Sequence, residues 1–150
     1  MTPKNRRVFL DTSVIFAAVL SPIGGARKLF QLGEAGMLKL VIGPNVLREC
    51  DAVVRRKVPS SLPALAQLLA LGQVETSIAP TKRHIALARS TVEYKPDALV
   101  LAEAISARPD WFITHDKEHF LKERQVSDLA FDIGTPGDLI QALKDDFTLP

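Results

Sequence analysis

Short apolar runs that alternate with helical segments are the feature that most constrains the fold of this chain. The predicted strands span residues 7–10, 38–42, 74–78, 111–114 and 129–133. Runs that are apolar at consecutive positions are typical of strands buried on both faces of a parallel sheet. The alternation therefore predicts an α/β fold with one central, mainly parallel sheet covered on both faces.

Helices are expected between and after these strands. They are predicted at residues 13–20, 26–35, 44–57, 64–71, 82–92 and 96–107, with two more beginning at Lys117 and Pro136. Pro44 suits the first turn of its helix, where a missing N–H costs nothing. Because no internal repeat or low-complexity tract interrupts the pattern, we expect one domain over residues 1–150.

The composition agrees with this expectation and excludes few functions. Of the 150 residues, 47% are hydrophobic and 24% are charged, and the net charge of +2 neither requires nor excludes a nucleic-acid partner. The single cysteine, Cys50, cannot form an internal disulfide. The apolar run after the basic N-terminus is broken at Asp11, and no run reaches the ~18 apolar residues of a membrane span. We therefore expect a cytoplasmic protein.

Four carboxylates lie near the ends of predicted elements. In open α/β sheets, ligands bind beyond the carboxyl ends of the strands. Asp11 and Asp116 each follow a strand, Asp97 begins a nearly all-apolar helix, and Glu49 lies in the helix after the second strand. Helix capping is the alternative explanation for each Asp. Thr12 and Ser13 can cap the first helix themselves, which would leave Asp11 free to point into the crevice.

Glu49 can be placed by its angle around the helix. At roughly 100° per residue, it lies on the flank of an apolar stripe that contains Val46, Cys50 and Val54. No cation stands three or four positions away to pair with it. A solvated position at the border of the stripe is the alternative.

Several carboxylates that converge without cations repel each other, and a hard divalent ion is the usual remedy. Mg²⁺ prefers oxygen ligands and is often held by a few carboxylates together with substrate phosphates. Zinc is disfavoured because Cys50 stands alone and His84 has no partner pattern. A zinc protease is also disfavoured, since His115 is followed by Asp116 instead of Glu, so His115 and His119 are expected to face solvent.

Five segments in register with these elements resemble one family. They are Val-Phe-Leu-Asp-Thr-Ser-Val at 8–14, Gly-Pro-Asn-Val-Leu-Arg-Glu at 43–49, Asp-Ala-Leu-Val-Leu-Ala-Glu-Ala-Ile at 97–105, Trp-Phe-Ile-Thr-His-Asp-Lys-Glu-His-Phe at 111–120 and Gly-Thr-Pro at 134–136. The set resembles the PIN-domain nucleases, most closely the bacterial toxin-like, VapC-related branch. The resemblance implies a three-layer α/β/α sandwich and a ribonuclease that cuts single-stranded RNA with Mg²⁺ or Mn²⁺.

The resemblance also implies roles for individual residues. Asp11, Glu49, Asp97 and Asp116 match the catalytic acids, with Asp11, Asp97 and Asp116 as metal ligands and Glu49 as a ligand or water-orienting base. Ser13 and Thr114 match polar positions beside the first and fourth acids. We assign both to substrate binding, and Ser13 also to orienting Asp11. Many relatives carry an extra Asp beside the third acid, where this chain has Pro96 and Ala98.

Other partners and functions stay open at this point. A toxin of this branch would pair with a small antitoxin protein. The Leu-rich segment 62–71 is consistent with a homodimer, and burial in the core explains it nearly as well. The alternatives are an RNA-processing PIN nuclease that is not a toxin, and a PIN module that binds RNA or a partner without cutting. The cations at 55–57 and 82–83 either follow a phosphate backbone or solvate helix ends. Tyr94 either stacks on a base or, as we slightly favour, closes the edge of the core.

Overall fold

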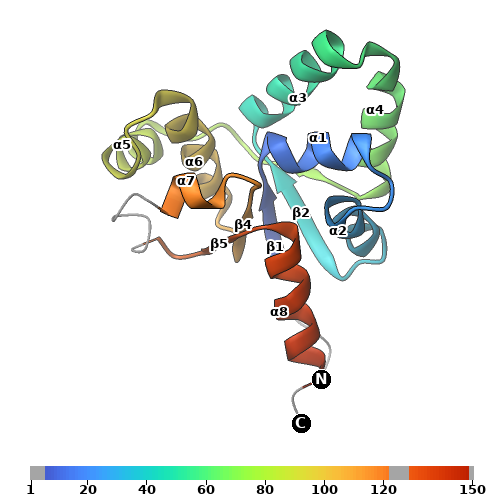
Figure 1. Ribbon diagram of the computed structural model, residues 1–150. Coiled ribbons are helices and arrows are strands. Elements are labelled where there is room, and N and C mark those ends of the chain that lie inside the picture. Colours follow the sequence, from blue (N-terminus) through green and yellow to red (C-terminus); the bar gives the residue numbers. More distant parts are fainter. Residues whose placement is uncertain (1–5, 122–128, 149–150) are drawn as a thin grey trace.

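A five-stranded parallel sheet forms the centre of the computed structural model, which describes residues 6–121 and 129–148 (Figure 1). Its strands are β1 (Arg6–Leu10), β2 (Leu38–Ile42), β3 (Glu75–Thr76), β4 (Trp111–Ile113) and β5 (Asp132–Gly134), in the order β3-β2-β1-β4-β5. Every strand pair is parallel. The predicted α/β sandwich with a central parallel sheet is confirmed.

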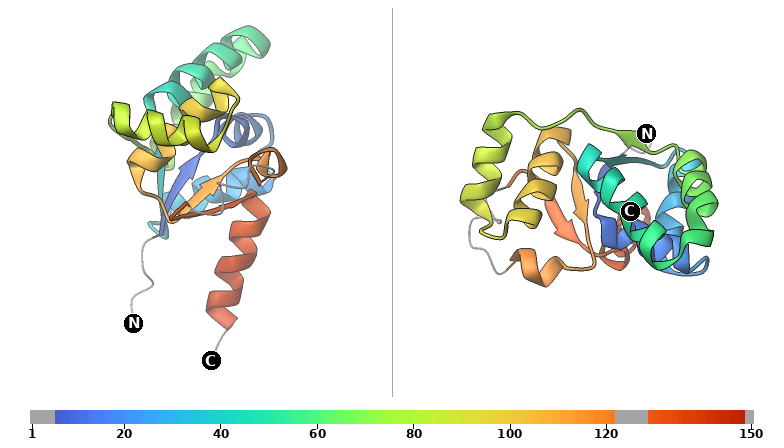
Figure 2. Two further views of the ribbon diagram at one scale, coloured as in Figure 1. Left: turned by 90° about the vertical axis from the view of Figure 1, so that its left-hand side faces the viewer. Right: turned by 90° about the horizontal axis from the view of Figure 1, so that it is seen from above.

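Helices flank this sheet (Figures 1 and 2). They are α1 (Thr12–Leu20), α2 (Gly25–Glu34), α3 (Pro44–Lys57), a short 3₁₀ turn η1 (Pro59–Ser61), α4 (Leu62–Leu71), α5 (Lys82–Thr91), α6 (Lys95–Ala107), α7 (Lys117–Leu121) and α8 (Pro136–Thr148). The helix boundaries predicted from the sequence lie within two residues of these bounds. Helices α5 and α6 lie side by side, away from α2 and α4 (Figure 2).

The two edge strands are shorter than predicted. β3 keeps only Glu75 and Thr76 of the predicted run 74–78, and β5 begins at Asp132 instead of 129. Leu129 and Phe131 pack against the core without belonging to a strand. An apolar run indicates that its residues are buried, but a strand also needs a neighbouring strand to pair with. Only the three residues from Trp111 to Ile113 of β4 pair with β5.

The strand order places a crevice beside β1. This strand lies between β2 and β4. After β1 the chain adds β2 and β3 on one side of it, and then adds β4 and β5 on the other side. Val8, Phe9 and Leu10 are fully buried because β1 has neighbours on both edges and helices over its faces. A reversal of strand order of this kind opens a binding crevice at the carboxyl ends of the strands. Asp11 follows β1 at this point, and Asp116 follows β4 beside it.

Helix α8 packs against β4, β5 and α2 (Figure 1). An ion pair between Arg6 and Asp146 joins its last turns to the start of β1. In residues 6–121 and 129–148, no single helix is long and apolar enough to cross a membrane. The helices α1 and α2, which are joined by a sharp bend, reach that length and composition only when taken together.

Candidate active site

All four predicted acids line one pocket. A cavity of about 230 Å³ is bordered by Asp11, Thr12, Ser13, Phe16, Glu49, Val53, Pro96, Asp97, Val100 and Asp116. Asp11 comes from the end of β1, Glu49 from α3, Asp97 from the first turn of α6 and Asp116 from the residue before α7. None of these lining residues is a Lys, Arg or His. The pocket therefore concentrates negative charge at the carboxyl ends of β1 and β4.

Asp11 is the most constrained of the four acids. Its Oδ1 accepts the backbone N–H of Thr12 at 2.8 Å, and its Oδ2 accepts the hydroxyls of Thr114 at 2.8 Å and Ser13 at 3.2 Å. Asp11 is itself the N-cap of α1, so the expectation that Thr12 and Ser13 would cap this helix is wrong. Asp11 both caps α1 and lines the pocket, because each of its carboxylate oxygens can accept more than one hydrogen bond.

The surroundings of Asp11 oppose its charge. Burial raises the pKa of Asp11, hydrogen bonds from Thr114, Thr12 and Ser13 lower it, and the charge of Asp116 raises it further. Burial is the largest of these causes, so the net pKa lies above the ordinary value of 3.8. An ionised carboxylate has about four acceptor positions, and the three donors leave Asp11 able to accept one more partner. A bound cation would offset both the burial and the repulsion.

The hydroxyls of Thr114 and Ser13 form hydrogen bonds that link the segment after β1 to the segment after β4. Thr114 is completely buried, and besides binding Asp11 it accepts the backbone N–H of Asp116 at 3.0 Å. Ser13 accepts the N–H of His115 at 3.2 Å. Both hydroxyls thus hold the segment that carries the fourth acid against the first acid. These contacts support an orienting role, whereas the substrate-binding role assigned to both residues stays a prediction.

The other three acids are more accessible. Glu49 is exposed on the flank of α3, whose inner face buries Val46, Cys50 and Val54, as the helical angle predicted. Asp97 is half-buried in the first turn of α6, and Asp116 is exposed. One buried acid and three more accessible ones make a pocket that is open to solvent.

Glu103 is a structural carboxylate that the sequence analysis did not single out. It is only 1% exposed, and its oxygens accept the backbone N–H groups of Asn45 at 2.7 Å and Val46 at 3.1 Å. These groups belong to the first turn of α3, where N–H groups have no partner within the helix. Glu103 of α6 therefore joins the helix that carries Asp97 to the helix that carries Glu49.

Gly43 makes room for this carboxylate. A Cβ atom on Gly43 would lie 2.2 Å from Cδ of Glu103, so no larger residue fits here without a shift. Burial raises the pKa of Glu103, the N–H donors and Arg48 lower it, and Glu49 raises it, with burial dominant. The signal in the sequence was a lone Glu inside the apolar run 98–105, six residues after Asp97.

Comparisons with known proteins identify the family of this chain and a structural neighbour. The family described as PIN domain matches residues 7–118, which is about three quarters of the chain. This chain belongs to the PIN-domain family. The crystal structure of PAE2754 from Pyrobaculum aerophilum resembles it with a TM-score of 0.63 and 15% identity, over 94% of this chain and 97% of that chain. At this identity the likeness supports the fold alone, and no curated protein matches the sequence.

The donor set of this PIN domain fits a hard divalent ion. PIN domains are generally nucleases that use such ions. The side chains that line the pocket offer carboxylate oxygens from Asp11, Glu49, Asp97 and Asp116 and hydroxyl oxygens from Thr12 and Ser13. Within residues 6–121 and 129–148, no three His, Cys, Asp or Glu side chains are arranged to hold an ion directly. Mg²⁺ usually keeps several waters and takes one or two carboxylates, so the pocket fits an ion held partly through water.

Other polar and aromatic residues of the PIN domain are not among the lining residues of this pocket. His115 is exposed, as expected, whereas the side chain of His119 lies outside the described residues. Tyr94 is 61% exposed, so the expectation that it closes the edge of the core is wrong: it is the N-cap of α6 and lies on the surface. Residues 55–57 are exposed at the end of α3, and 82–83 at the start of α5.

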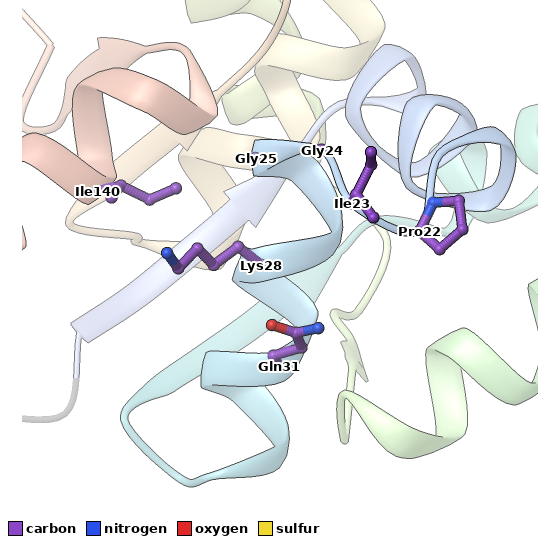
Figure 3. A pocket seen from close by; sticks show the side chains of 7 residues that line it. All are labelled: Pro22, Ile23, Gly24, Gly25, Lys28, Gln31 and Ile140. Carbon is purple, nitrogen blue, oxygen red and sulfur yellow. The ribbon is translucent and has the colours of Figure 1, made fainter.

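A larger cavity of about 520 Å³ lies between the α1–α2 turn and α8 (Figure 3). Its lining residues are Pro22, Ile23, Gly24, Gly25, Lys28, Gln31 and Ile140. Lys28 is the only charged residue among them, and no carboxylate borders this cavity. It therefore lacks the ligands for a metal ion, and the acidic pocket is the better candidate for an active site despite its smaller volume.

Proposed function

We propose that this PIN domain is a Mg²⁺- or Mn²⁺-dependent endoribonuclease that hydrolyses single-stranded RNA. The observation that carries the proposal is the shared pocket of Asp11, Glu49, Asp97 and Asp116, with no cationic side chain among its lining residues. Such a pocket repels an RNA phosphate until a divalent cation enters. The burial that raises the pKa of Asp11 adds to the advantage of a cation there.

The acids divide the work according to their positions. Asp11, Asp97 and Asp116 would hold the ion directly or through water, and exposed Glu49 would orient the attacking water or act as a further ligand. When bound, such an ion lowers the pKa of a water molecule and stabilises the leaving oxygen. Ser13 and Thr114 hold Asp11 in one orientation through their hydroxyls. Glu103 keeps α3, and with it Glu49, against α6.

Metal-dependent cleavage is the direct test. Single-stranded RNA should be cut with Mg²⁺ or Mn²⁺ and left intact with EDTA, and Asp11→Asn should abolish cutting. Asp132→Asn is the matched control, because Asp132 is an exposed carboxylate at the first residue of β5, the opposite end of the sheet from the pocket. Equal cutting in chelator, or no cutting with any metal, would instead support a module that binds RNA or a partner without cleaving it.

Thermal unfolding tests the ion independently of cleavage. A ligand that binds only the folded state stabilises it by RT ln(1 + [L]/Kd), so Mg²⁺ should raise the melting temperature of the wild-type protein. Asp97→Asn should reduce this rise, because Asp97 lines the pocket. In the absence of metal, the variant should be at least as stable as the wild type, since one of the mutually repelling charges is gone. An unchanged response to Mg²⁺ would remove Asp97 from the site.

The proposal for the biological role rests on the resemblance to the VapC-related branch. We propose that the whole chain acts as one cytoplasmic domain, as the toxin of a toxin–antitoxin pair, and that a small antitoxin protein blocks it. Induced expression should then arrest growth, and Asp11→Asn should relieve the arrest. Growth without arrest, in cells where the active protein is present, would favour an RNA-processing nuclease over a toxin. A homodimer through the Leu-rich helix α4 is part of the same proposal, and sedimentation would test it.

A further inference from the structure

The acidic pocket has an apolar wall that a metal site does not need. Phe16, Val53, Pro96 and Val100 line it together with the four acids. Phe16 lies on α1 and Val53 on α3, and these two helices pack against each other. Phe16 is half-buried, so part of its ring faces the pocket while the rest packs on the core.

One stripe on α3 leads from the acids to a cation. Glu49, Val53 and Lys57 stand four positions apart, which places them on the same face of the helix. At 1.5 Å per residue, Glu49 and Lys57 are roughly 12 Å apart along the helix axis. The Lys57 ammonium nitrogen lies 5.7 Å from the centre of the Phe16 ring. Carboxylate, apolar surface and ammonium therefore follow one another along the wall.

We propose that Phe16 and Lys57 form a nucleotide-binding subsite beside the acids. An unpaired RNA base stacks on the Phe16 ring, and Lys57 binds a backbone phosphate next to that base. The inference rests on the proposed function for the identity of the ligand as RNA. It adds the residues that hold one nucleotide adjacent to the cleavage point.

The chemistry of a nucleotide matches the order of groups along the wall. A base is flat and stacks on aromatic rings whatever its identity, and its flanking phosphates are anionic. Lys57 covers the Phe16 ring through a cation–π contact, whose attraction is weak at an exposed site. An arriving base takes the ring surface, and the ammonium moves to the phosphate. A base inside a duplex presents no open face, so this subsite favours single strands.

Binding of a labelled single-stranded RNA with cleavage-resistant phosphorothioate linkages, measured by fluorescence anisotropy in Mg²⁺ so that the pocket is neutralised while the RNA stays intact, tests the subsite. Phe16→Leu should weaken binding about tenfold, since stacking on an aromatic side chain strengthens binding by roughly five- to 150-fold per base. Lys57→Gln should weaken it several-fold and reduce the salt dependence by about one ion. Phe16→Tyr, which keeps the ring, should bind like the wild type and show that the loss comes from the aromatic face and not from packing.

Arg55→Gln is the matched control on the same helix. It removes the same charge two positions from Lys57, but the Arg55 guanidinium binds Asp51 at 2.8 Å and is not part of the stripe. Its effect on RNA binding should be small. An abasic scan along the RNA adds a second readout: one position should weaken binding to the wild type about tenfold and have no effect on Phe16→Leu, because the partner ring is already gone.

The outcomes separate the subsite from the proposed function. If the wild type binds and cuts RNA but Phe16→Leu and Lys57→Gln bind as well as the wild type, the subsite is wrong and the nuclease proposal stands. If the folded wild type binds no single-stranded RNA, both proposals fail. If Phe16→Tyr binds as weakly as Phe16→Leu, the ring acts through packing and the stacking role is overturned.

Discussion

The Thr114 hydroxyl donates a hydrogen bond of 2.8 Å to Oδ2 of Asp11, across 103 residues of sequence. The bond joins the segment after β4 to the residue after β1, and these strands are neighbours in the sheet. The same hydroxyl accepts the N–H of Asp116. The orientation of the first acid is therefore coupled to the position of the fourth, and the coupling is internal because Thr114 is fully buried.

Replacing this hydroxyl should destabilise the protein more than replacing an ordinary buried one. Thr114→Val keeps a similar shape but removes a donor to a carboxylate, a bond typically worth about 1.5–3 kcal/mol. Thr91→Val is the control, because the buried Thr91 donates only to a neutral carbonyl, that of Leu87, where about 0.5–1.5 kcal/mol is typical. Urea unfolding measures both losses. Equal losses would show that the bond to Asp11 contributes nothing special.

The pH dependence of stability should reveal the buried charge of Asp11. Its folded pKa lies above the ordinary 3.8, because burial opposes ionisation and Asp116 adds repulsion. Its contribution to stability is therefore greatest below pH 3.8 and falls as the pH rises through the folded pKa. Without divalent ions, the stability of the wild type relative to Asp11→Asn should decrease between about pH 3.5 and pH 7.

Asp138 provides the opposite case for the same measurement. The ammonium of Lys117 at 2.7 Å and the N–H of Thr135 lower the pKa of Asp138. Its contribution to stability is present above the ordinary 3.8 and is lost as the pH falls through the lowered value. The stability of the wild type relative to Asp138→Asn should thus rise with pH. Unfolding free energies are to be measured from neutral pH to below 3.8, and slopes of the same sign for both variants would contradict the assignment.

Removing the Glu103 carboxylate should cost more stability than removing any exposed one. Glu103→Ala leaves the N–H groups of Asn45 and Val46 without their acceptor, and each unsatisfied buried group costs about 1–3 kcal/mol. Glu34→Ala, at an exposed carboxylate at the end of α2, should stay within ±0.5 kcal/mol of the wild type. Chemical denaturation compares the two. A small loss for Glu103→Ala would mean that water replaces the carboxylate at the start of α3.

A methyl group on Gly43 should also be costly, and through the same carboxylate. In Gly43→Ala the new Cβ would lie 2.2 Å from Cδ and 2.6 Å from Cβ of Glu103, so we expect a loss of about 1–3 kcal/mol from overpacking. Gly137→Ala is the control, because its Cβ meets only the Thr135 hydroxyl, at 3.7 Å. Placed in α8, it should stabilise the protein by several tenths of a kcal/mol. If both alanines behave alike, the close approach of Glu103 to Gly43 is not maintained in solution.

The reactivity of the single cysteine, Cys50, should show whether α3 stays closed in solution. Cys50 is buried in α3, and burial raises its pKa to about 12. Because the thiolate is the reactive form, iodoacetamide at pH 8 should leave the folded protein unmodified and label it in denaturant, as mass spectrometry would show. Rapid labelling under native conditions would reveal local opening of α3.

The helices and the inner strands were predictable because their signals are local. In α3, Pro44 begins the helix, and Val46, Cys50 and Val54 form its buried face, which also placed Glu49 on the flank. The edge strands β3 and β5 were overestimated, since apolar residues such as Leu129 are buried without pairing. The prediction that Tyr94 closes the edge of the core was wrong, because the exposure of a side chain depends on what packs against it and not on its residue type alone.

The sequence by itself determined the order of strands and helices and which face of each helix is apolar. The acids at the ends of these elements suggested the chemistry of a divalent metal site. Only the tertiary structure decided which groups meet. Asp11 caps α1 and accepts the Thr114 hydroxyl, and Glu103 accepts N–H groups 58 and 57 residues away. The reason is physical: periodicity reflects neighbours within a few positions, whereas these contacts depend on the order β2-β1-β4 and on the packing of α6 against α3. The desolvation that raises the pKa of Asp11 arises from that packing.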